Sequence, residues 1–146
     1  MTLLPAPVDV ATPAAMAELG ARLAEQLGAG QVVAIRGPLG AGKTTLVRGL
    51  CAALGVASED VSSPTYALCN VYAAPGLTVA HMDLYRLEDA AALLATGLEE
   101  WIAAPGVLCL IEWPDHGRAV LPADTLWLEL TLPTPQSRRV RQIAAP

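Results

Sequence analysis

Hydrophobic residues in the first third of the chain follow helical, strand-like and again helical spacing. Over residues 13–27 they recur every three or four positions, after a Thr-Pro pair that suits a helix start and before glycines that suit a stop. The short apolar run 31–36 predicts a buried parallel strand. Residues 43–54 again have apolar positions on one helical face, so a second helix is expected there.

The remaining segments alternate between strand-like and helical patterns. Residues 1–10 are expected to form an irregular or short extended arm, and residues 57–64 are polar and turn-rich. The sequence then predicts a hairpin of strands 65–72 and 77–85 and a helix over 87–102 that is broken near Gly97. A buried strand over 107–112, a loop, a half-exposed strand over 125–132 and an edge strand over 138–144 are expected to follow. We therefore predict one α/β domain covering residues 1–146, with ligands bound beyond the carboxyl ends of the strands.

A glycine-rich loop joins the first predicted strand to the second predicted helix. GPLGAGKT (37–44) matches G-x-x-x-x-G-K-[ST] at every fixed position, and the strand and helix supply the context that this motif requires. Its backbone N–H groups and the positive end of the helix suit a phosphate. We expect Lys43 to reach the β- and γ-phosphates, the Thr44 hydroxyl to bind Mg²⁺ and Thr45 to lie near the α-phosphate. The predicted nucleotide-binding residues of this loop are Gly37, Pro38, Leu39, Gly40, Ala41, Gly42, Lys43, Thr44 and Thr45.

Two acidic residues stand at the ends of predicted strands. Asp83 ends LTVAHMD and Glu112 ends VLCLIE. A Mg²⁺ ion on the phosphates needs a carboxylate near the loop, and hydrolysis needs a group that orients the attacking oxygen. A solvated or helix-capping carboxylate is the alternative for each residue. His81, on the same strand face as Asp83, is interpreted as structural, and Trp113 is the tryptophan best placed to reach the pocket.

Composition narrows the function further. The net charge of −5 argues against direct, sequence-independent binding to nucleic acid. Lys43 is the only lysine, so the Asn-Lys-x-Asp signature of guanine-specific proteins cannot occur. The three cysteines form no Cys-x-x-Cys pair and predict buried thiols in a reducing compartment. With no signal-peptide pattern and no apolar run of about 20 residues, a cytoplasmic protein without a membrane segment is expected.

Four motifs together resemble one family. GPLGAGKTTLVRGL, SPTYAL, HMDLYRL and IEWP occur in this order, and the chain resembles the TsaE family over nearly its whole length. TsaE is the small bacterial ATPase required for N6-threonylcarbamoyladenosine (t6A) in tRNA. The resemblance implies a P-loop NTPase-like fold with a mixed, mostly parallel sheet flanked by helices. It also implies slow ATP hydrolysis that TsaB and TsaD stimulate, with turnover resetting the TsaB–TsaD complex and the partners holding the tRNA.

The resemblance also assigns roles to individual residues. It implies that Lys43 and Thr44 contact phosphate and Mg²⁺, that Glu112 is the second Mg²⁺ ligand and that Asp83 orients the water. Lys43, Asp83 and Glu112 are therefore the expected catalytic residues. The resemblance also places Ser63 and Thr65 in a switch-like loop. The position of this segment, about twenty residues after Thr44, fits either a loop that senses the γ-phosphate or an ordinary turn before a strand. Thr12 is expected near the nucleobase, and Arg138 or Arg139 near the nucleotide.

Two other functions remain open on the sequence. One is a small P-loop kinase for a metabolite; Arg86 and Arg118 are available to it, but no arginine-rich lid segment is evident. The other is a nucleotide-dependent interaction module that binds ATP without hydrolysing it. Phosphate transfer to an acceptor would indicate the first, and binding without turnover the second.

Overall fold

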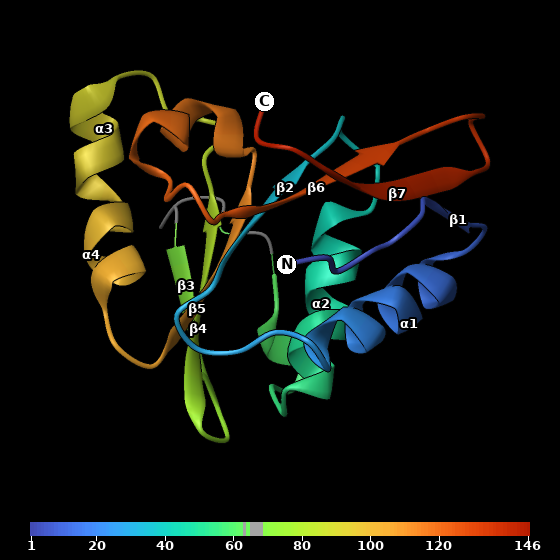
Figure 1. Cartoon of the computed structure of the whole chain (residues 1–146), viewed down its shortest axis with the longest axis horizontal. Helices are drawn as coiled ribbons and strands as arrows, with labels where there is room; N and C mark the ends of the chain where they lie inside the picture. Colours follow the sequence, from blue (N-terminus) through green and yellow to red (C-terminus); the bar gives the residue numbers. More distant parts are fainter. Residues whose placement is uncertain (63, 65–68) are drawn as a thin grey trace.

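A computed structural model describes residues 1–62, 64 and 69–146 of the protein. These residues form a seven-stranded sheet with helices on both faces (Figure 1). This confirms the predicted α/β class. The elements, in chain order, are β1 (Val8–Val10), α1 (Pro13–Ala24), β2 (Val32–Arg36), α2 (Lys43–Ala53), the 3₁₀ helix η1 (Ser58–Asp60), β3 (Cys69–Ala74), β4 (Leu77–Asp83), α3 (Ala90–Ala95), α4 (Leu98–Ala103), β5 (Val107–Glu112), the 3₁₀ helix η2 (Pro114–Val120), β6 (Leu126–Thr131) and β7 (Arg138–Ile143).

The sheet is mixed, with its parallel strands in the centre. The strand order is β1-β7-β6-β2-β5-β4-β3. β6, β2, β5 and β4 pair in parallel, while β1–β7, β7–β6 and β4–β3 pair antiparallel. Parallel pairs are thus half of the six pairs, fewer than the "mostly parallel" sheet that the resemblance implied. The carboxyl ends of the central strands meet at one edge, where ligands of such folds bind.

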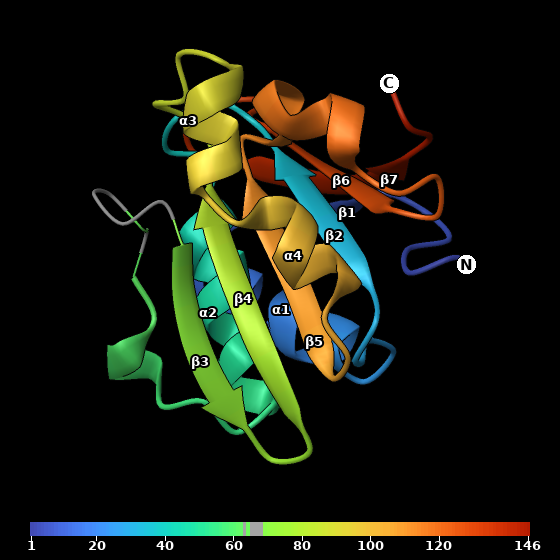
Figure 2. The same ribbon diagram turned by 90° about the vertical axis from the view of Figure 1, so that its left-hand side faces the viewer.

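Two apolar cores cover the two faces of the sheet. α1 and α2 pack on one face with the apolar side chains of β2, β5 and β6, including Val33, Ile35, Leu110 and Leu128. α3, α4 and η2 cover the other face, where Met82 and Ile111 are buried (Figure 2). Successive side chains of β4 and β5 therefore point to opposite cores, as the period of a strand requires.

Helices α1 and α2 meet backbone to backbone at two glycines. A β-carbon on Gly20 would lie 2.3 Å from the Leu46 carbonyl oxygen, and one on Gly49 would lie 2.1 Å from the Ala17 carbonyl oxygen. No larger residue fits either position without moving a helix. This close contact fixes α1 against the helix that begins at the glycine-rich loop.

The helix start at Thr12 is confirmed, because its hydroxyl accepts a hydrogen bond from the Ala15 N–H at 3.1 Å. The break near Gly97 and the hairpin turn at Pro75-Gly76 are confirmed too. Within the described residues, no helix is both long and apolar enough to cross a membrane.

Four details of the sequence prediction were wrong. α1 ends at Ala24, one turn before Leu27, because the next residues form turns. The loop expected after β5 contains η2. β6 is mostly buried, since β2 and β7 flank it and both its faces are covered. β7 is not the edge strand, because the N-terminal arm adds β1 outside it, with Val8 opposite Val140.

Candidate functional site

The glycine-rich loop leaves β2 at Arg36 and enters α2 at Lys43. Gly42 caps the helix with φ 98°, a conformation that favours glycine, and a β-carbon there would lie 3.0 Å from the Met16 side chain. Gly37 is needed for space, because its β-carbon would lie 2.6 Å from the Leu130 carbonyl oxygen. The first turn of α2 therefore points its unpaired N–H groups at the open end of the sheet.

The Lys43 side chain folds back over its own loop. Its Nζ donates hydrogen bonds to the carbonyl oxygens of Gly37 at 2.7 Å and Pro38 at 2.9 Å. It also lies 4.1 Å from the ring centroid of Trp113, within the range of a cation–π contact. Burial lowers the pKa of Lys43 from its usual value, against the opposing effects of Glu112 and Asp83. The ammonium group is therefore held mainly by neutral partners.

Trp113 reaches this position through an unusual backbone. Its φ of 54° and ψ of 54° lie in the left-handed region, which no other non-glycine residue occupies in the part of the chain that the structure describes. The turn directs the indole over Lys43, and the Tyr85 ring packs on it at a centroid distance of 4.6 Å. A tryptophan in this conformation costs of order 1–3 kcal/mol, which points to a functional constraint.

Thr44 and Glu112 form the centre of the site. The Thr44 hydroxyl lies 3.0 Å from Oε1 and 3.2 Å from Oε2 of Glu112, to which it donates. Glu112 is only 2% exposed, although it ends a strand. A hydroxyl and a carboxylate at the first turn of a phosphate-binding helix are the oxygen ligands that suit Mg²⁺.

Asp83 stands beside Glu112 because β4 and β5 are parallel and in register. The two residues are paired at the ends of their strands. Oδ1 of Asp83 accepts a hydrogen bond from the Tyr85 N–H at 2.9 Å, which orients the carboxylate. The register of β4 and β5 therefore places the two strand-end carboxylates side by side at the edge of the sheet where the loop lies.

A cleft of about 570 Å³ opens between the loop, the two strand ends and Trp113. It is lined by Leu39, Gly40, Gly42, Lys43, Thr44, Thr45, Pro64, Asp83, Tyr85, Arg86, Glu112 and Trp113. Of the predicted loop residues, Gly37, Pro38 and Ala41 do not line it. Ala41 is fully buried and donates its N–H to the Pro38 carbonyl at 3.2 Å, so this residue supports the loop from beneath.

A smaller pocket of about 260 Å³ lies on the other side of the loop. It shares Gly40, Gly42 and Thr45 with the cleft and adds Thr12, Met16 and Arg138 among its lining residues. Arg138 donates from Nε to the Gly40 carbonyl at 3.0 Å, which ties β7 to the loop. Arg139 does not line the pocket; it pairs with Asp9 on β1 at 2.7 Å.

The sequence prediction did not name every residue of the site, and two of the residues that it did name are not described by the structure. Tyr85 was missed, although its position two residues after Asp83 at a strand end was a usable signal. His81 was interpreted as structural, and Tyr72 was not considered. Ser63 and Thr65 lie outside the described residues. Within the part of the chain that the structure describes, no group of three His, Cys, Asp or Glu side chains could hold a metal ion.

Comparisons with known proteins agree with this geometry. The sequence model of the family described as "Threonylcarbamoyl adenosine biosynthesis protein TsaE" matches residues 10–141. The crystal structure of Bacillus subtilis YdiB superposes with a TM-score of 0.77 and 26% identity, over 97% of this chain and 86% of that one.

Two curated relatives bear the name tRNA threonylcarbamoyladenosine biosynthesis protein TsaE. The protein of Haemophilus influenzae is 43% identical over 96 residues, which are 65% of this chain and 60% of that protein. The protein of Treponema pallidum is 38% identical over 111 residues, which are 76% of this chain and 80% of that protein. The chain therefore belongs to the TsaE family.

Proposed function

We propose that this chain binds and hydrolyses ATP as an accessory subunit in the biosynthesis of N6-threonylcarbamoyladenosine in tRNA. Membership of the TsaE family and the names of its relatives support the pathway. The observation that carries the nucleotide chemistry is the Thr44–Glu112 pair, 3.0 Å apart, at the start of a helix that also presents Lys43. This pair supplies both oxygen ligands that a P-loop needs beside its lysine.

Lys43 would exchange its present partners for phosphate when ATP binds. Its Nζ now donates to two loop carbonyls, both neutral. Phosphate oxygens accept stronger, charge-assisted hydrogen bonds than carbonyl oxygens do. The N–H groups at the start of α2 would hold the same phosphates. Thr45, which lines both the cleft and the smaller pocket, stands where the phosphate chain would meet the ribose.

Thr44 and Glu112 would hold Mg²⁺. Both donor groups are oxygen atoms that lie within 3.2 Å of each other, and the phosphates and water would complete the coordination. Mg²⁺ held by these two residues would supply positive charge that offsets the negative charge of the phosphates. Asp83, in register with Glu112 and lining the same cleft, would accept a hydrogen bond from the attacking water and orient it.

The smaller pocket is the proposed site of the nucleobase. Thr12 and Met16 from α1 and Arg138 from β7 line it beside Gly40. No acidic side chain lines this pocket among the described residues, so a carboxylate is not available there to accept from both N–H donors of a guanine. The pocket therefore favours adenine, in agreement with the absence of the guanine signature.

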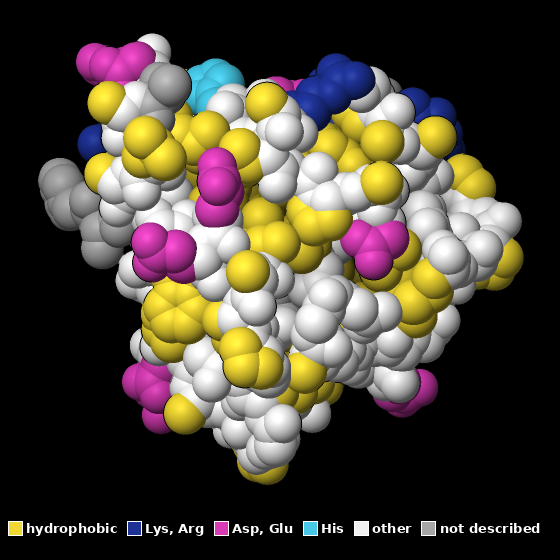
Figure 3. All heavy atoms as spheres, turned by 60° about the vertical axis from the view of Figure 1, so that its left-hand side comes forward, with side chains coloured by type: hydrophobic (Ala, Val, Ile, Leu, Met, Phe, Trp, Pro, Cys, Tyr) yellow, Lys and Arg dark blue, Asp and Glu magenta, His cyan; other side chains and the backbone are white. Residues whose placement is uncertain are grey.

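The proposed partners are subunits of the TsaB–TsaD type, with ATP turnover resetting their complex and the partners holding the tRNA. The charge of the chain fits this division. The face over α3 and α4 carries acidic side chains among apolar ones, with basic side chains gathered at its upper edge (Figure 3). Glu88, Asp89, Glu99 and Glu100 are exposed there, which disfavours phosphate backbones. A cytoplasmic location would follow from this role.

The test is ATP hydrolysis by the purified chain, alone and with a TsaB–TsaD pair. We expect weak turnover alone, a clear rise with the pair, and loss of both in Lys43→Ala and without Mg²⁺. An Asp83→Asn variant should bind ATP but turn it over slowly. Turnover that the competent pair does not change would count against the accessory role. Transfer of γ-phosphate to a small acceptor would indicate a kinase, and binding without any hydrolysis an interaction module.

A further inference from the structure

A line of buried hydrogen bonds leads away from Glu112 into the core. Oε2 of Glu112 lies 2.6 Å from Nε2 of His81 on the neighbouring strand β4. Nδ1 of the same imidazole lies 3.1 Å from the Tyr72 hydroxyl on β3. The Tyr72 hydroxyl in turn accepts a hydrogen bond from the Ser62 backbone nitrogen at 3.4 Å and lies 3.3 Å from the Ser62 carbonyl oxygen; its single proton can serve either that carbonyl or Nδ1 of His81.

These side chains stand where an apolar core is expected. His81 is fully buried and Glu112 nearly so, on the face of the sheet that α2 covers. Burial raises the pKa of Tyr72, so its hydroxyl keeps its proton and can act as a donor. Buried polar groups are costly unless every hydrogen bond is made, and the described part of the chain leaves no buried side-chain nitrogen or oxygen unsatisfied. Packing alone would be served better by apolar residues.

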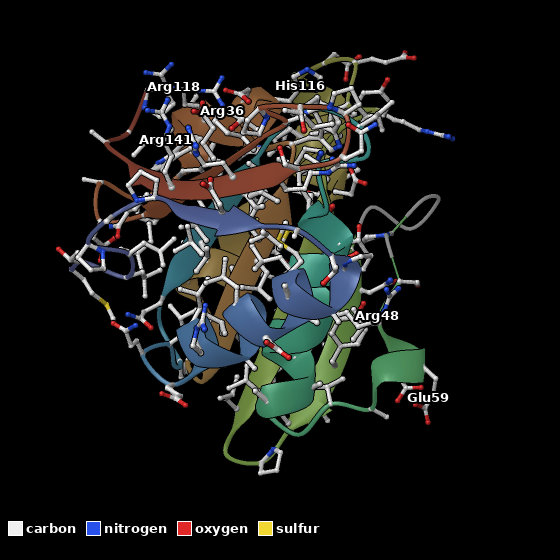
Figure 4. The ribbon with its side chains drawn as sticks, turned by 90° about the vertical axis from the view of Figure 1, so that its right-hand side faces the viewer. Arg36, Arg48, Glu59, His116, Arg118 and Arg141 are labelled. Atoms are coloured by element: carbon white, nitrogen blue, oxygen red, sulfur yellow. The ribbon has the colours of Figure 1, made fainter. Side chains whose placement is uncertain are left out.

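The far end of the line is a short backbone segment that several elements hold. Arg48 points from α2 toward the segment after η1 and donates from Nη2 to the Val61 carbonyl at 3.2 Å (Figure 4). Asn70 donates from Nδ2 to the Ser62 carbonyl at 3.2 Å. Residues 61 and 62 are therefore fixed from α2 and β3, and Ser62 leads toward Pro64, which lines the cleft.

We propose that His81 and Tyr72 are positioning residues that hold the Glu112 carboxylate in the orientation needed for Mg²⁺ and connect it mechanically to the backbone at Ser62. His81 donates from Nε2 to Oε2, since an ionised carboxylate can only accept. That bond fixes Oε2, so Oε1 stays directed at the Thr44 hydroxyl. Tyr72 then sets the angle of the imidazole from its other nitrogen.

The connection makes the two ends of the line depend on each other. A shift of Glu112 toward a bound cation changes the position of His81, and through Tyr72 the hydrogen bonds at Ser62. By thermodynamic reciprocity, fixing Ser62 favours the same position of the carboxylate. Outer partners of metal ligands typically change metal affinity by about 10–100-fold when removed. This inference rests on the proposed function, because it assumes that Glu112 faces Mg²⁺.

Two substitutions of His81 separate its two nitrogens. The amide nitrogen of His81→Gln can occupy the place of Nε2 and keep the bond to Glu112. The amide of His81→Asn can reach only the place of Nδ1 and loses that bond. Calorimetry would measure the affinity for a β,γ-imido analogue of ATP with Mg²⁺ and with a chelator. We expect His81→Asn to reduce the Mg²⁺-dependent gain in affinity by about 10-fold or more, and His81→Gln to keep most of it.

The controls distinguish positioning from a general loss of structure. A folding defect would weaken binding with and without Mg²⁺ alike, and thermal unfolding would reveal it. His116→Asn is the matched control, because this exposed histidine hydrogen-bonds through Nδ1 to the Leu84 carbonyl at 2.9 Å and lies outside the line from Glu112 to Ser62. Equal Mg²⁺-dependent gains in His81→Asn and wild type would overturn the inference alone. A wild-type chain that binds no nucleotide would overturn the proposed function as well.

Tyr72→Phe tests the connection to Ser62. Amide hydrogen exchange at Ser62, followed by NMR, should slow or quicken in the wild-type chain when the Mg²⁺ complex of the analogue binds. In Tyr72→Phe this response should disappear while the complex still binds. An equal response in both chains, or none in the wild type despite binding, would overturn the connection.

Discussion

Replacing Thr44 by Val removes the one hydroxyl that Glu112 shares with the phosphate-binding helix. The two side chains have the same shape, so the change deletes a donor without opening a cavity. The bonds lost are those of 3.0 and 3.2 Å to the two carboxylate oxygens. Glu112 keeps its bond to His81 at 2.6 Å. The fold should therefore survive, and any loss of affinity would have a local cause.

The size of the effect follows from these contacts. A hydrogen bond to a charged group contributes about 1.5–3 kcal/mol, and the lower end applies here because Thr44 is only half-buried and water can replace its hydroxyl. The free energy of unfolding without ligand should fall by about 1.5 kcal/mol, a shift in Tm of roughly 3–6 °C. With Mg²⁺ present the hydroxyl would be a direct ligand, so its loss should cost about 10–100-fold in Mg²⁺-dependent affinity.

Calorimetry with the β,γ-imido analogue of ATP, at a fixed nucleotide concentration and varied Mg²⁺ concentration, would measure this affinity. Thermal unfolding would measure the stability. Thr44→Ser is the matched control, since it keeps the hydroxyl and should retain the wild-type Mg²⁺ dependence. The reasoning fails if Thr44→Val binds the Mg²⁺ complex as tightly as the wild type. It also fails if Thr44→Ser is as weak as Thr44→Val, because the hydroxyl would then not be the group that matters.

Three further predictions concern packing, thiols and the nucleotide. Gly49→Ala should lower the free energy of unfolding by about 1–3 kcal/mol, because the clash with Ala17 outweighs a gain in helix propensity of about 1 kcal/mol. A denaturant titration would measure this, and Gly28→Ala, where the added β-carbon meets open space, should be nearly neutral. Burial raises the pKa of Cys51 and Cys109 to about 12, so a thiol reagent at pH 8 should modify at most Cys69 in the native chain and all three thiols after unfolding; three fast reactions would contradict this. ATP should alter tryptophan emission as Lys43 leaves the ring of Trp113, and Trp113→Phe should lose most of that signal; GTP should compete poorly with ATP.

The sequence predicted the elements of the fold well where local patterns decide them. The Thr12 cap, the break at Gly97 and the helix after the glycine loop each depend on residues within one or two turns. Sheet position is a long-range property, and there the prediction was wrong. β1 pairs with β7, which lies more than a hundred residues later in the chain, and nothing in the three residues of β1 indicates that partner.

The same distinction applies to the site. The loop motif and the two strand-end carboxylates could be found because each has its own pattern, and parallel register then brings Asp83 and Glu112 together. Trp113 could be expected near the pocket because it follows Glu112, and it does line the cleft, but its contact with Lys43 and the role of Tyr72 could not be found in this way. The contact of Trp113 with Lys43 depends on one left-handed residue, and the contact of Tyr72 with His81 depends on an antiparallel partner strand. Both arise from tertiary geometry that no spacing in the sequence encodes.

The contacts of Lys43 and Glu112 suggest why nucleotide and metal should bind together. Lys43 and Glu112 form no ion pair with each other in the part of the chain that the structure describes. Lys43 donates hydrogen bonds to loop carbonyls and lies over Trp113. Glu112 is hydrogen-bonded to Thr44 and His81. The charge of Lys43 is thus satisfied by partners that are weaker than an opposite charge at the same distance, and Glu112 is held by a hydroxyl and an imidazole. Phosphate would give Lys43 an opposite charge, and Mg²⁺ would do the same for Glu112. Either ligand alone would leave one of these charges with its present partners, so the largest gain comes when both arrive as one complex.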